Sequence, residues 1–426
     1  RLFASDGPLP DDAPPLVDLA DTKMYPSWGN PVPYPFENLT CKATCVRLVL
    51  TPRKGTGVYL SELKLFSQDQ ALAQRSAQGG AANFTAVQVV PDVDGDGGDD
   101  VIAGTKAGGL LLLNAQGAIQ WRHGLGSAVL AIADLDADDA ERRTIAATDS
   151  VGNVVALTTA GVERWTTAIP RYKARQIARV LFPARIDGKE AGQVLVAGAD
   201  NWRYHVIDAD GKIRWHYESV HPSTAGTAAD LDGDGRQELL LGTAYYSWHC
   251  VDPDGSRRWR YRTRGGPGCN AVLAADVRGD AMPEVFFGGD DTLVQAATAT
   301  GRPLWNVSTG DEVTALACLD VDGDGKQEIL VASLSFNVFC LDGDGTVLWR
   351  RDLGAPVRAM TALHGARPGI LAGCSDGTVH LLQPRDGTTL ATCSVDGGVI
   401  ALAGRTTNFA VVAGRNGTLT ALRPMP

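Results

Sequence analysis

Acidic residues recur at a fixed spacing in three segments of the chain. In the segment "DLDGDGRQE" the carboxylates at positions one, three, five and nine are Asp230, Asp232, Asp234 and Glu238. Gly233 and Gly235 permit the backbone dihedral angles that a tight loop needs. These side chains and the carbonyl of Arg236 can converge on one hard cation, and calcium prefers such oxygen ligands. The spacing therefore predicts a structural calcium site.

Two other segments repeat this spacing in full. "DVDGDGGDD" supplies Asp92, Asp94, Asp96 and Asp100, and "DVDGDGKQE" supplies Asp320, Asp322, Asp324 and Glu328. Weaker copies begin at Asp134 and Asp276. In the copy at Asp276, Arg278 replaces the third-position acid, so we expect its positive charge to stand in for an ion. The alternative for all copies is an acidic turn that holds no ion.

The acidic loops belong to a longer repeat. Each precedes two apolar strands, a turn and a tryptophan; these tryptophans, 44 to 50 residues apart, are Trp121, Trp165, Trp215, Trp259, Trp305 and Trp349. Four short strands in a unit of this length are typical of a β-propeller. We count eight innermost strands, which begin near Thr85, Val129, Arg179, Gly226, Ala271, Thr314, Met360 and Ile400.

The last unit has only three predicted strands before the chain ends. We expect residues near Gln70 to Ser76 to supply its fourth strand, which would close the ring and remove an exposed sheet edge. The predicted fold is thus all-β: an eight-bladed β-propeller of four-stranded blades over residues 70–426. Residues 1–69 would form a small N-terminal extension of β and irregular structure.

The repeat resembles known propeller families. The acidic loop, the strand that follows and "GTVLWR" (Gly345 to Arg350) resemble the calcium-loop repeats of FG-GAP and VCBS type, and the turn with its tryptophan resembles the quinoprotein-like repeat. Quinone-dependent dehydrogenases of this architecture carry two adjacent cysteines at the cofactor. Because no two cysteines of this chain are adjacent, the resemblance implies the fold without a quinone site.

The first 69 residues are rich in proline and then change character. "CVRLVLTPRKGTGVYLSELKLF" (Cys45 to Phe66) predicts two strands. It resembles the final hairpin of discoidin-like domains, which bind sugars. We expect an accessory hairpin beside the propeller; the alternative is the tail of a discoidin-like domain.

Composition indicates a secreted globular protein. The 426 residues are 44% hydrophobic and carry a net charge of −10, much of it in the acidic loops. No basic cluster suggests nucleic acid, and no apolar run approaches the roughly 18 residues of a membrane helix. Calcium loops fill reliably outside the cytosol, so we expect an extracellular or periplasmic protein, either a mature form or a fragment.

Comparison of the units with one another points to a second kind of site. Where the third strand begins, most units carry apolar residues, such as Leu111, Val155 and Phe339, but units three and four carry His205 and His249. Their flanking segments are aromatic and basic. The candidate catalytic residues there are His205, His249, Tyr246, Arg203, Arg171 and Tyr172, and the candidate substrate-binding residues are Trp202, Tyr204, Tyr245, Trp248, His221, Arg264 and Asn270.

Histidine and tyrosine transfer protons, arginine binds carboxylates and aromatic rings stack on sugars. This set suits an anionic polysaccharide, and it suits β-elimination at a uronic acid. The type of site resembles that of propeller polysaccharide lyases. The first function hypothesis is therefore a secreted lyase, with one of His205, His249 or Tyr246 as the base and Arg203 or Arg171 on the carboxylate. The alternative is a non-catalytic propeller that binds glycan or protein.

Overall fold

The computed structural model describes the strands Leu2–Ser5, Cys45–Leu48 and Ala73–Ala77, and residues 83–423 apart from 264–265, 366, 407–408 and 416. The chain divides into two compact units, Arg1–Ser67 and Gln68–Pro426. In the first unit β1 (Leu2–Ser5) pairs antiparallel with β2 (Cys45–Leu48). The second strand expected within Cys45 to Phe66 lies outside the described residues.

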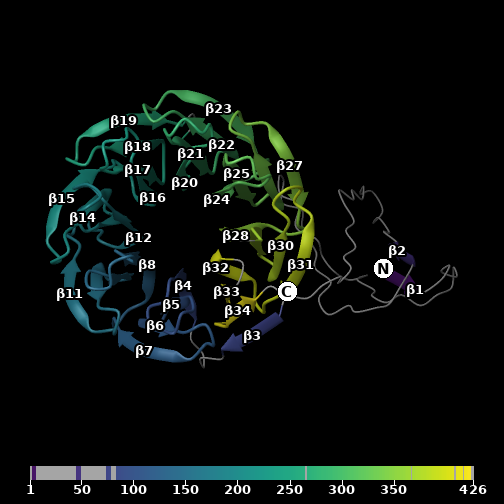
Figure 1. Ribbon diagram of the computed structural model, residues 1–426, viewed down its shortest axis with the longest axis horizontal. Helices are drawn as coiled ribbons and strands as arrows, with labels where there is room; N and C mark the ends of the chain where they lie inside the picture. The colour runs from purple at the N-terminus through teal and green to yellow at the C-terminus, as the bar shows by residue number, and fades with distance from the viewer. Residues whose placement is uncertain are drawn as a thin grey trace, which may run out of the picture. The chain divides into compact units, whose positions relative to one another are not determined.

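The second unit is a ring of eight four-stranded antiparallel sheets, the blades (Figure 1). Blades 1 to 4 consist of β4 (Phe84–Val90), β5 (Asp100–Thr105), β6 (Gly109–Leu113) and β7 (Ile119–Gly124); β8 (Val129–Leu135), β9 (Thr144–Asp149), β10 (Asn153–Leu157) and β11 (Glu163–Ala168); β12 (Ala178–Ala184), β13 (Val194–Ala199), β14 (Arg203–Ile207) and β15 (Ile213–Glu218); and β16 (Ser223–Ala229), β17 (Glu238–Thr243), β18 (Ser247–Val251) and β19 (Arg257–Arg262).

Blades 5 to 7 consist of β20 (Cys269–Ala275), β21 (Glu284–Gly289), β22 (Leu293–Ala297) and β23 (Pro303–Ser308); β24 (Val313–Leu319), β25 (Glu328–Ser333), β26 (Asn337–Leu341) and β27 (Val347–Asp352); and β28 (Val357–Leu363), β29 (Gly369–Cys374), β30 (Thr378–Leu382) and β31 (Thr389–Ser394). Blade 8 has the order β3-β34-β33-β32. Its strands are β32 (Val399–Thr406), β33 (Phe409–Gly414), β34 (Leu419–Arg423) and β3 (Ala73–Ala77). The prediction of an all-β, eight-bladed ring is confirmed.

The fourth strand of blade 8 comes from a distant part of the sequence. Strand β3 pairs antiparallel with β34, from Ala73 opposite Arg423 to Ala77 opposite Leu419, and the two lie side by side in Figure 1. This pairing gives the backbone groups of β34 a partner on both sides, because β33 lies along the other edge.

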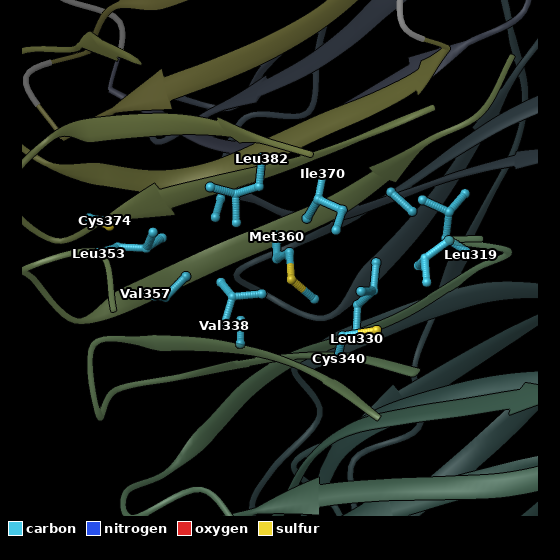
Figure 2. Close-up of a cluster of buried hydrophobic side chains, with 14 of the residues drawn as sticks. Leu319, Leu330, Val338, Cys340, Leu353, Val357, Met360, Ile370, Cys374 and Leu382 are labelled. Carbon is cyan, nitrogen blue, oxygen red and sulfur yellow. The ribbon is translucent and has the colours of Figure 1, made fainter. Parts of the chain in front are cut away.

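The core lies between the blades. Second strands are buried at every position, as in β17 and β25, because each of their faces packs on a different neighbouring blade. Fourth strands such as β11 alternate between exposed and half-buried residues. Figure 2 shows one such layer, in which Leu330 and Val338 of blade 6 pack with Met360 of blade 7. The layer explains the continuous apolar runs of the sequence.

The repeated tryptophan joins a blade to the one that follows it in five places around the ring. The indole Nε1 of Trp121 donates to the carbonyl of Thr159, 2.9 Å away in the following blade. A Cβ atom on Gly161 would lie 2.7 Å from that indole ring, so only glycine lets the turn lie against it. Equivalent bonds run from Trp165, Trp259, Trp305 and Trp349 to carbonyls of their following blades.

The connections alternate between two faces of the ring. We call the loop face the one that carries the acidic loops and the turns between third and fourth strands; there Arg258 joins the acidic loop of blade 4 to Asp252 of such a turn. We call the turn face the one that carries the turns between second and third strands and the links between blades. There the amide of Ser219, in a link, donates to the carbonyl of Trp202, in a turn.

Candidate functional sites

The three complete acidic loops share one backbone geometry on the loop face. In blade 6 the carboxylate of Asp320 accepts hydrogen bonds from the amides of Gly323 and Gly325, at 2.6 and 3.0 Å. The first aspartates of the other two loops, Asp92 and Asp230, accept the same pair of bonds. The glycines have φ near +85°, which explains their place in the motif.

Carboxylate oxygens converge in each of these loops. One oxygen from each member of three groups lies within 4.8 Å of the others: Asp92, Asp94 and Asp96; Asp230, Asp232 and Asp234; and Asp320, Asp322 and Glu328. Like charges this close repel one another unless a cation lies among them. The arrangement therefore has the donor set of a hard cation such as calcium.

The ninth residue of each loop is buried and braces it. One oxygen of Asp100, Glu238 and Glu328 accepts the amide of the second loop residue, at 2.6 to 2.9 Å. Burial raises the pKa of all three carboxyl groups. In blade 1 the other oxygen, Oδ1 of the fully buried Asp100, has no hydrogen-bond partner. A buried charged oxygen is costly without a partner, so the residues of blade 1 fit a bound cation.

The two weaker copies use arginine instead. In blade 2 the guanidinium of Arg143 binds both oxygens of Asp134, at 3.1 and 2.9 Å, and Arg143 is buried. In blade 5 the Nε atom of Arg278 lies 3.6 Å from Glu284, the ninth residue. Arg278 thus lies where a positive charge was expected.

His205 and His249 occupy equivalent positions but lie between different pairs of blades. His205 is 1% exposed and shares its face of β14 with Ile207, which packs toward blade 2. His249 is fully buried, and its Nδ1 lies 2.6 Å from the hydroxyl of Tyr217 in blade 3. Among the described residues no hydrogen bond or ring contact joins the two histidines. They are therefore one blade apart and do not converge on a common ligand.

Burial also fixes the charge state of these histidines. Burial, with the neighbouring His216 and Arg203, lowers the pKa of His205 to about 4. Burial and nearby arginines, first Arg260, lower the pKa of His249 to about 3. Both imidazoles are therefore neutral near pH 7 and have no open path to a polymer.

A third histidine, which the sequence comparison missed, occupies the same position in blade 7. His380 is the third residue of β30, as His205 is of β14 and His249 of β18. It is 6% exposed, neither ring nitrogen has a hydrogen-bond partner, and burial lowers its pKa to about 4. A buried histidine at this position thus recurs among the blades and is not confined to blades 3 and 4, whose flanking segments are aromatic and basic.

Several other candidates form an aromatic strip on the turn face of blades 3 and 4. His221 lies at its centre, with ring centroids 5.6 Å from Trp202, 5.8 Å from Tyr245 and 5.5 Å from Tyr246. The side chains of Tyr245 and Tyr246 are 54% and 50% exposed. Burial, followed by the charges of Arg260 and Lys173, lowers the pKa of His221.

Cations flank the strip. The ammonium of Lys173 lies 3.3 Å from the Trp202 ring centroid, and the guanidinium of Arg203 lies 3.7 Å from that of Tyr172. Arg203 also pairs with Glu218 at 3.7 Å. Such cation–π contacts fix the rings and keep positive charge beside them.

The turn that carries Tyr246 holds this residue in a left-handed backbone conformation. Its equivalent position is Gly108, Gly152 and Gly377 in blades 1, 2 and 7, and all share a positive φ. A Cβ on Gly108 would meet the following link at 2.7 Å. Blades 3 to 6 instead carry Trp202, Tyr246, Thr292 and Phe336, with φ of 65 to 73°. Such strained positions concentrate at functional sites.

The remaining candidates divide between surface and core. Tyr204 is fully buried and donates its hydroxyl to the carbonyl of Ala225, 2.6 Å away. Trp248 is 2% exposed and stacks on Phe287, with centroids 3.9 Å apart. Both lie in the core because their strand is the third of its blade, covered on both faces. Arg171 is exposed in the link before β12, whereas Arg264 lies outside the described residues.

Asn270 belongs to a carboxylate site that the sequence did not reveal. Its Nδ2 atom donates to Oδ1 of Asp290 at 2.7 Å and to Oε1 of Glu312 at 2.9 Å. Burial, with the charge of Asp290, raises the pKa of Glu312. These residues come from a turn and a link of the turn face, far apart in sequence. In the link before Asn270, the carbonyl of Pro267 accepts the amide of Tyr246, and the next carbonyl, of Gly268, accepts the amide of Asp290. The pair of carboxylates therefore lies next to the strip.

The fold and both faces define a β-propeller with an embellished turn face, and comparison with known proteins agrees. The family model described as the lambda-carrageenase beta-propeller domain matches residues 291–396. The model described as the outer membrane protein assembly factor BamB matches residues 107–289. The chain is thus related to propellers of these two kinds.

Curated relatives and solved structures support the architecture. The BBSome complex member BBS2 of human and of mouse is 33% identical over 112 residues, which are 26% of this chain and 15% of theirs. BamB from Moraxella catarrhalis is 18% identical over 83% of this chain and 97% of its own, with a TM-score of 0.59. Sqt1 from Saccharomyces cerevisiae is 13% identical over 84% and 100%, with a TM-score of 0.66. These structures show the fold alone.

In the part of the chain that the structure describes, no helix has the length and hydropathy to cross a membrane.

Proposed function

We propose that the protein is a secreted propeller that binds an anionic polysaccharide on the turn face of blades 3 and 4. The observation that carries this proposal is the exposed pair Tyr245 and Tyr246, continued by His221 and Trp202 and flanked by cations. Aromatic faces stack on sugar rings, and Lys173 and the exposed Arg171 supply charge for anionic groups. The relation to a carrageenase propeller domain supports a polysaccharide as the ligand.

A second candidate function is hydrolysis of the bound glycan by Asp290 and Glu312. Both carboxylates accept a hydrogen bond from the same nitrogen, Nδ2 of Asn270, at 2.7 and 2.9 Å. The distance between the two accepting oxygens therefore cannot exceed the sum of these two distances. Retaining glycosidases place their two carboxyl groups at roughly 5–5.5 Å. The raised pKa of Glu312 suits a general acid, and Asp290 beside it suits the second carboxylate.

The lyase hypothesis rests on fewer residues than the sequence suggested. Elimination needs a base that reaches the proton on C5, and His205 and His249 are buried. Tyr246 is the candidate base that is half-exposed, and Arg171 is the exposed candidate for the carboxylate. The lyase hypothesis therefore requires Tyr246 to act as the base that removes the C5 proton.

One experiment separates these functions. The protein is titrated with uronic-acid, sulfated and neutral polysaccharides, and each mixture is assayed for ultraviolet absorbance of an unsaturated product and for new reducing ends. Binding weakened by salt, without product, supports the binding propeller. Reducing ends without absorbance support hydrolysis, and absorbance supports elimination. The Tyr245→Ala variant should lose binding, whereas Val151→Ala, which alters an exposed residue of the equivalent turn in blade 2, should not. Absence of binding to every polymer would contradict the proposal.

We also propose that acidic loops of the loop face bind calcium in a structural role. The support is the convergence of carboxylate oxygens and the unpartnered buried oxygen of Asp100. Calcium at its extracellular concentration would neutralise these oxygens and brace the loops, in keeping with a secreted protein.

A further inference from the structure

The residue immediately before the repeated tryptophan differs among the blades in a systematic way. It is Gln120, Leu304 and Leu348 in blades 1, 5 and 6, and Arg164, Arg214 and Arg258 in blades 2, 3 and 4. This position begins the fourth strand on the loop face, beside the connection between the first and second strands of the same blade. An arginine there can reach the place where an acidic loop would hold its cation.

In blade 4 the arginine does reach it. Nη2 of Arg258 lies 2.7 Å from Oδ2 of Asp232 and 3.2 Å from Oε1 of Glu238, and Nε lies 2.5 Å from Oδ1 of Asp252. Asp232 and Glu238 are two of the four carboxylates predicted to bind calcium. Glu238 is fully buried, so Arg258 partners the oxygen that is left unpartnered in Asp100.

The other two arginines show that this reach belongs to the position. In blade 3 the guanidinium of Arg214 binds both oxygens of Asp187, at 2.9 and 2.8 Å. In blade 2 Arg164 donates to the carbonyls of Glu141 and Arg143, at 3.2 and 3.3 Å. In each case the contacted residue lies in the connection between the first and second strands.

Blades 1 and 6 lack an arginine at this position. Gln120 and Leu348 carry no charge. Arg405 pairs with Asp99 of the loop in blade 1, at 3.1 Å, but within the described residues no ion pair reaches the first, third, fifth or ninth carboxylate of either loop. Blade 1 keeps the unpartnered buried oxygen of Asp100, and in blade 6 the buried Glu328 itself belongs to the converging group. The loop in blade 4 nevertheless has the same backbone hydrogen bonds to its first aspartate as the loop in blade 6. The difference between these loops therefore lies in the arginine.

We propose that Arg258 takes the place of the metal ion in blade 4, so that calcium binds the loops at Asp92 and Asp320 but not the loop at Asp230. This inference rests on the calcium proposal and divides its three candidate loops into two classes. A guanidinium and a calcium ion repel each other and compete for the same carboxylate oxygens. Arg258 therefore plays in blade 4 the part that Arg143 and Arg278 play in blades 2 and 5.

The test counts calcium ions bound to the full chain after chelator treatment, by titration calorimetry. The wild type should bind two ions. The double variant Asp230→Asn, Asp232→Asn should still bind two, whereas Asp320→Asn, Asp322→Asn should bind one. Arg258→Gln, which copies Gln120, should bind three. Leu348→Arg, which copies blade 4, should bind one, and it tests the idea in the opposite direction if Arg258→Gln does not fold.

The outcomes separate the two proposals. A folded wild type that binds no calcium removes the calcium proposal. A wild type that binds three ions, reduced to two by the Asp230 and Asp232 substitutions, overturns the role of Arg258 and leaves calcium binding intact. A folded Arg258→Gln variant that still binds two ions, or a folded Leu348→Arg variant that keeps both, also overturns it.

Discussion

The two faces of the ring differ in how closely they repeat. On the loop face one acidic turn recurs with the same hydrogen bonds in blades 1, 4 and 6. Weaker copies of it in blades 2 and 5 pair with Arg143 and Arg278. On the turn face, the aromatic strip lies on blades 3 and 4, with Trp202 and Tyr246 at the turn position where blades 1, 2 and 7 carry glycine. A structural feature thus recurs in most blades, whereas the aromatic residues that would contact one ligand gather in two neighbouring blades.

The largest expected effect comes from breaking the repeat where the ring closes. A chain that begins after Ala81 lacks β3, so β34 loses five residue pairs and becomes an exposed edge. We expect a loss of roughly 3 kcal/mol or more of unfolding free energy, summed over the lost hydrogen bonds and burial. Denaturant unfolding measures it, and a chain that begins at Gln70 is the control. Equal stability of the two truncations would contradict a role of β3 in closure.

Calcium removal tests the loop face. A ligand at 100 times its dissociation constant stabilises the native state by about 2.7 kcal/mol, so chelation should lower the melting temperature by several degrees. Asp320→Asn, Asp322→Asn should remove about half of this shift. A melting temperature that changes with neither chelator nor added calcium would show that the loops are stable without metal.

A glycine at the position of Tyr246 should weaken ligand binding without lowering the stability of the fold. Tyr246→Gly removes an exposed ring from the strip and places glycine at φ +67°. Loss of one interface aromatic commonly costs 1–2 kcal/mol, so affinity for the polysaccharide should fall roughly 10-fold while the melting temperature stays within about 2 °C. Thr292→Gly makes the same backbone change in blade 5 and should keep affinity. Equal loss in both variants would place the effect in the backbone and not in the ring.

The last prediction concerns the buried histidines, which occupy one position in blades with and without the aromatic strip. The pKa of His380 is lowered to about 4, against about 6.5 in the unfolded chain. The unfolded state therefore binds the proton first, and the stability present above pH 6.5 is lost as the pH falls toward 4. At pH 5 this loss is up to about 2 kcal/mol.

His380→Leu should consequently flatten the fall in melting temperature between pH 7 and pH 5. The carboxyl groups with raised pKa values act in the opposite direction, and comparing variant with wild type at each pH cancels them. A variant that keeps the full pH dependence would show that His380 does not titrate in this range. The same measurement on His249→Leu, in blade 4, shows whether the histidines of blades 4 and 7 make the same contribution to the pH dependence of stability.

The sequence was sufficient for the fold because its signals are local. Tryptophan spacing, glycines with positive φ and apolar strands all lie within one unit, so the number of blades and of strands could be counted. Strand β3 overlaps the stretch Gln70 to Ser76, where the missing strand was sought. Comparison of units also singled out the aromatic turns that carry Trp202 and Tyr246.

The sites depend on contacts between units, so the sequence predicted them less completely than the fold. Arg258 lies 26 residues beyond Asp232, and no local pattern tells that its guanidinium enters the loop. Asp290 and Glu312 meet only because a turn and a link share a face. The burial of His205 and His249 followed from third strands being covered on both sides, a tertiary effect that overrides their polar character.

The pairing of β3 with β34 has a consequence for how the molecule comes into being. Ala73 and Arg423 are partners, so nearly the whole propeller must leave the ribosome before the ring can lock. Until then, blade 1 presents an unmatched flank and the chain grows as an open arc. Contacts between such distant residues slow folding because the intervening loop must first close. During translation the unfinished arc exposes apolar surface to chaperones and to other chains.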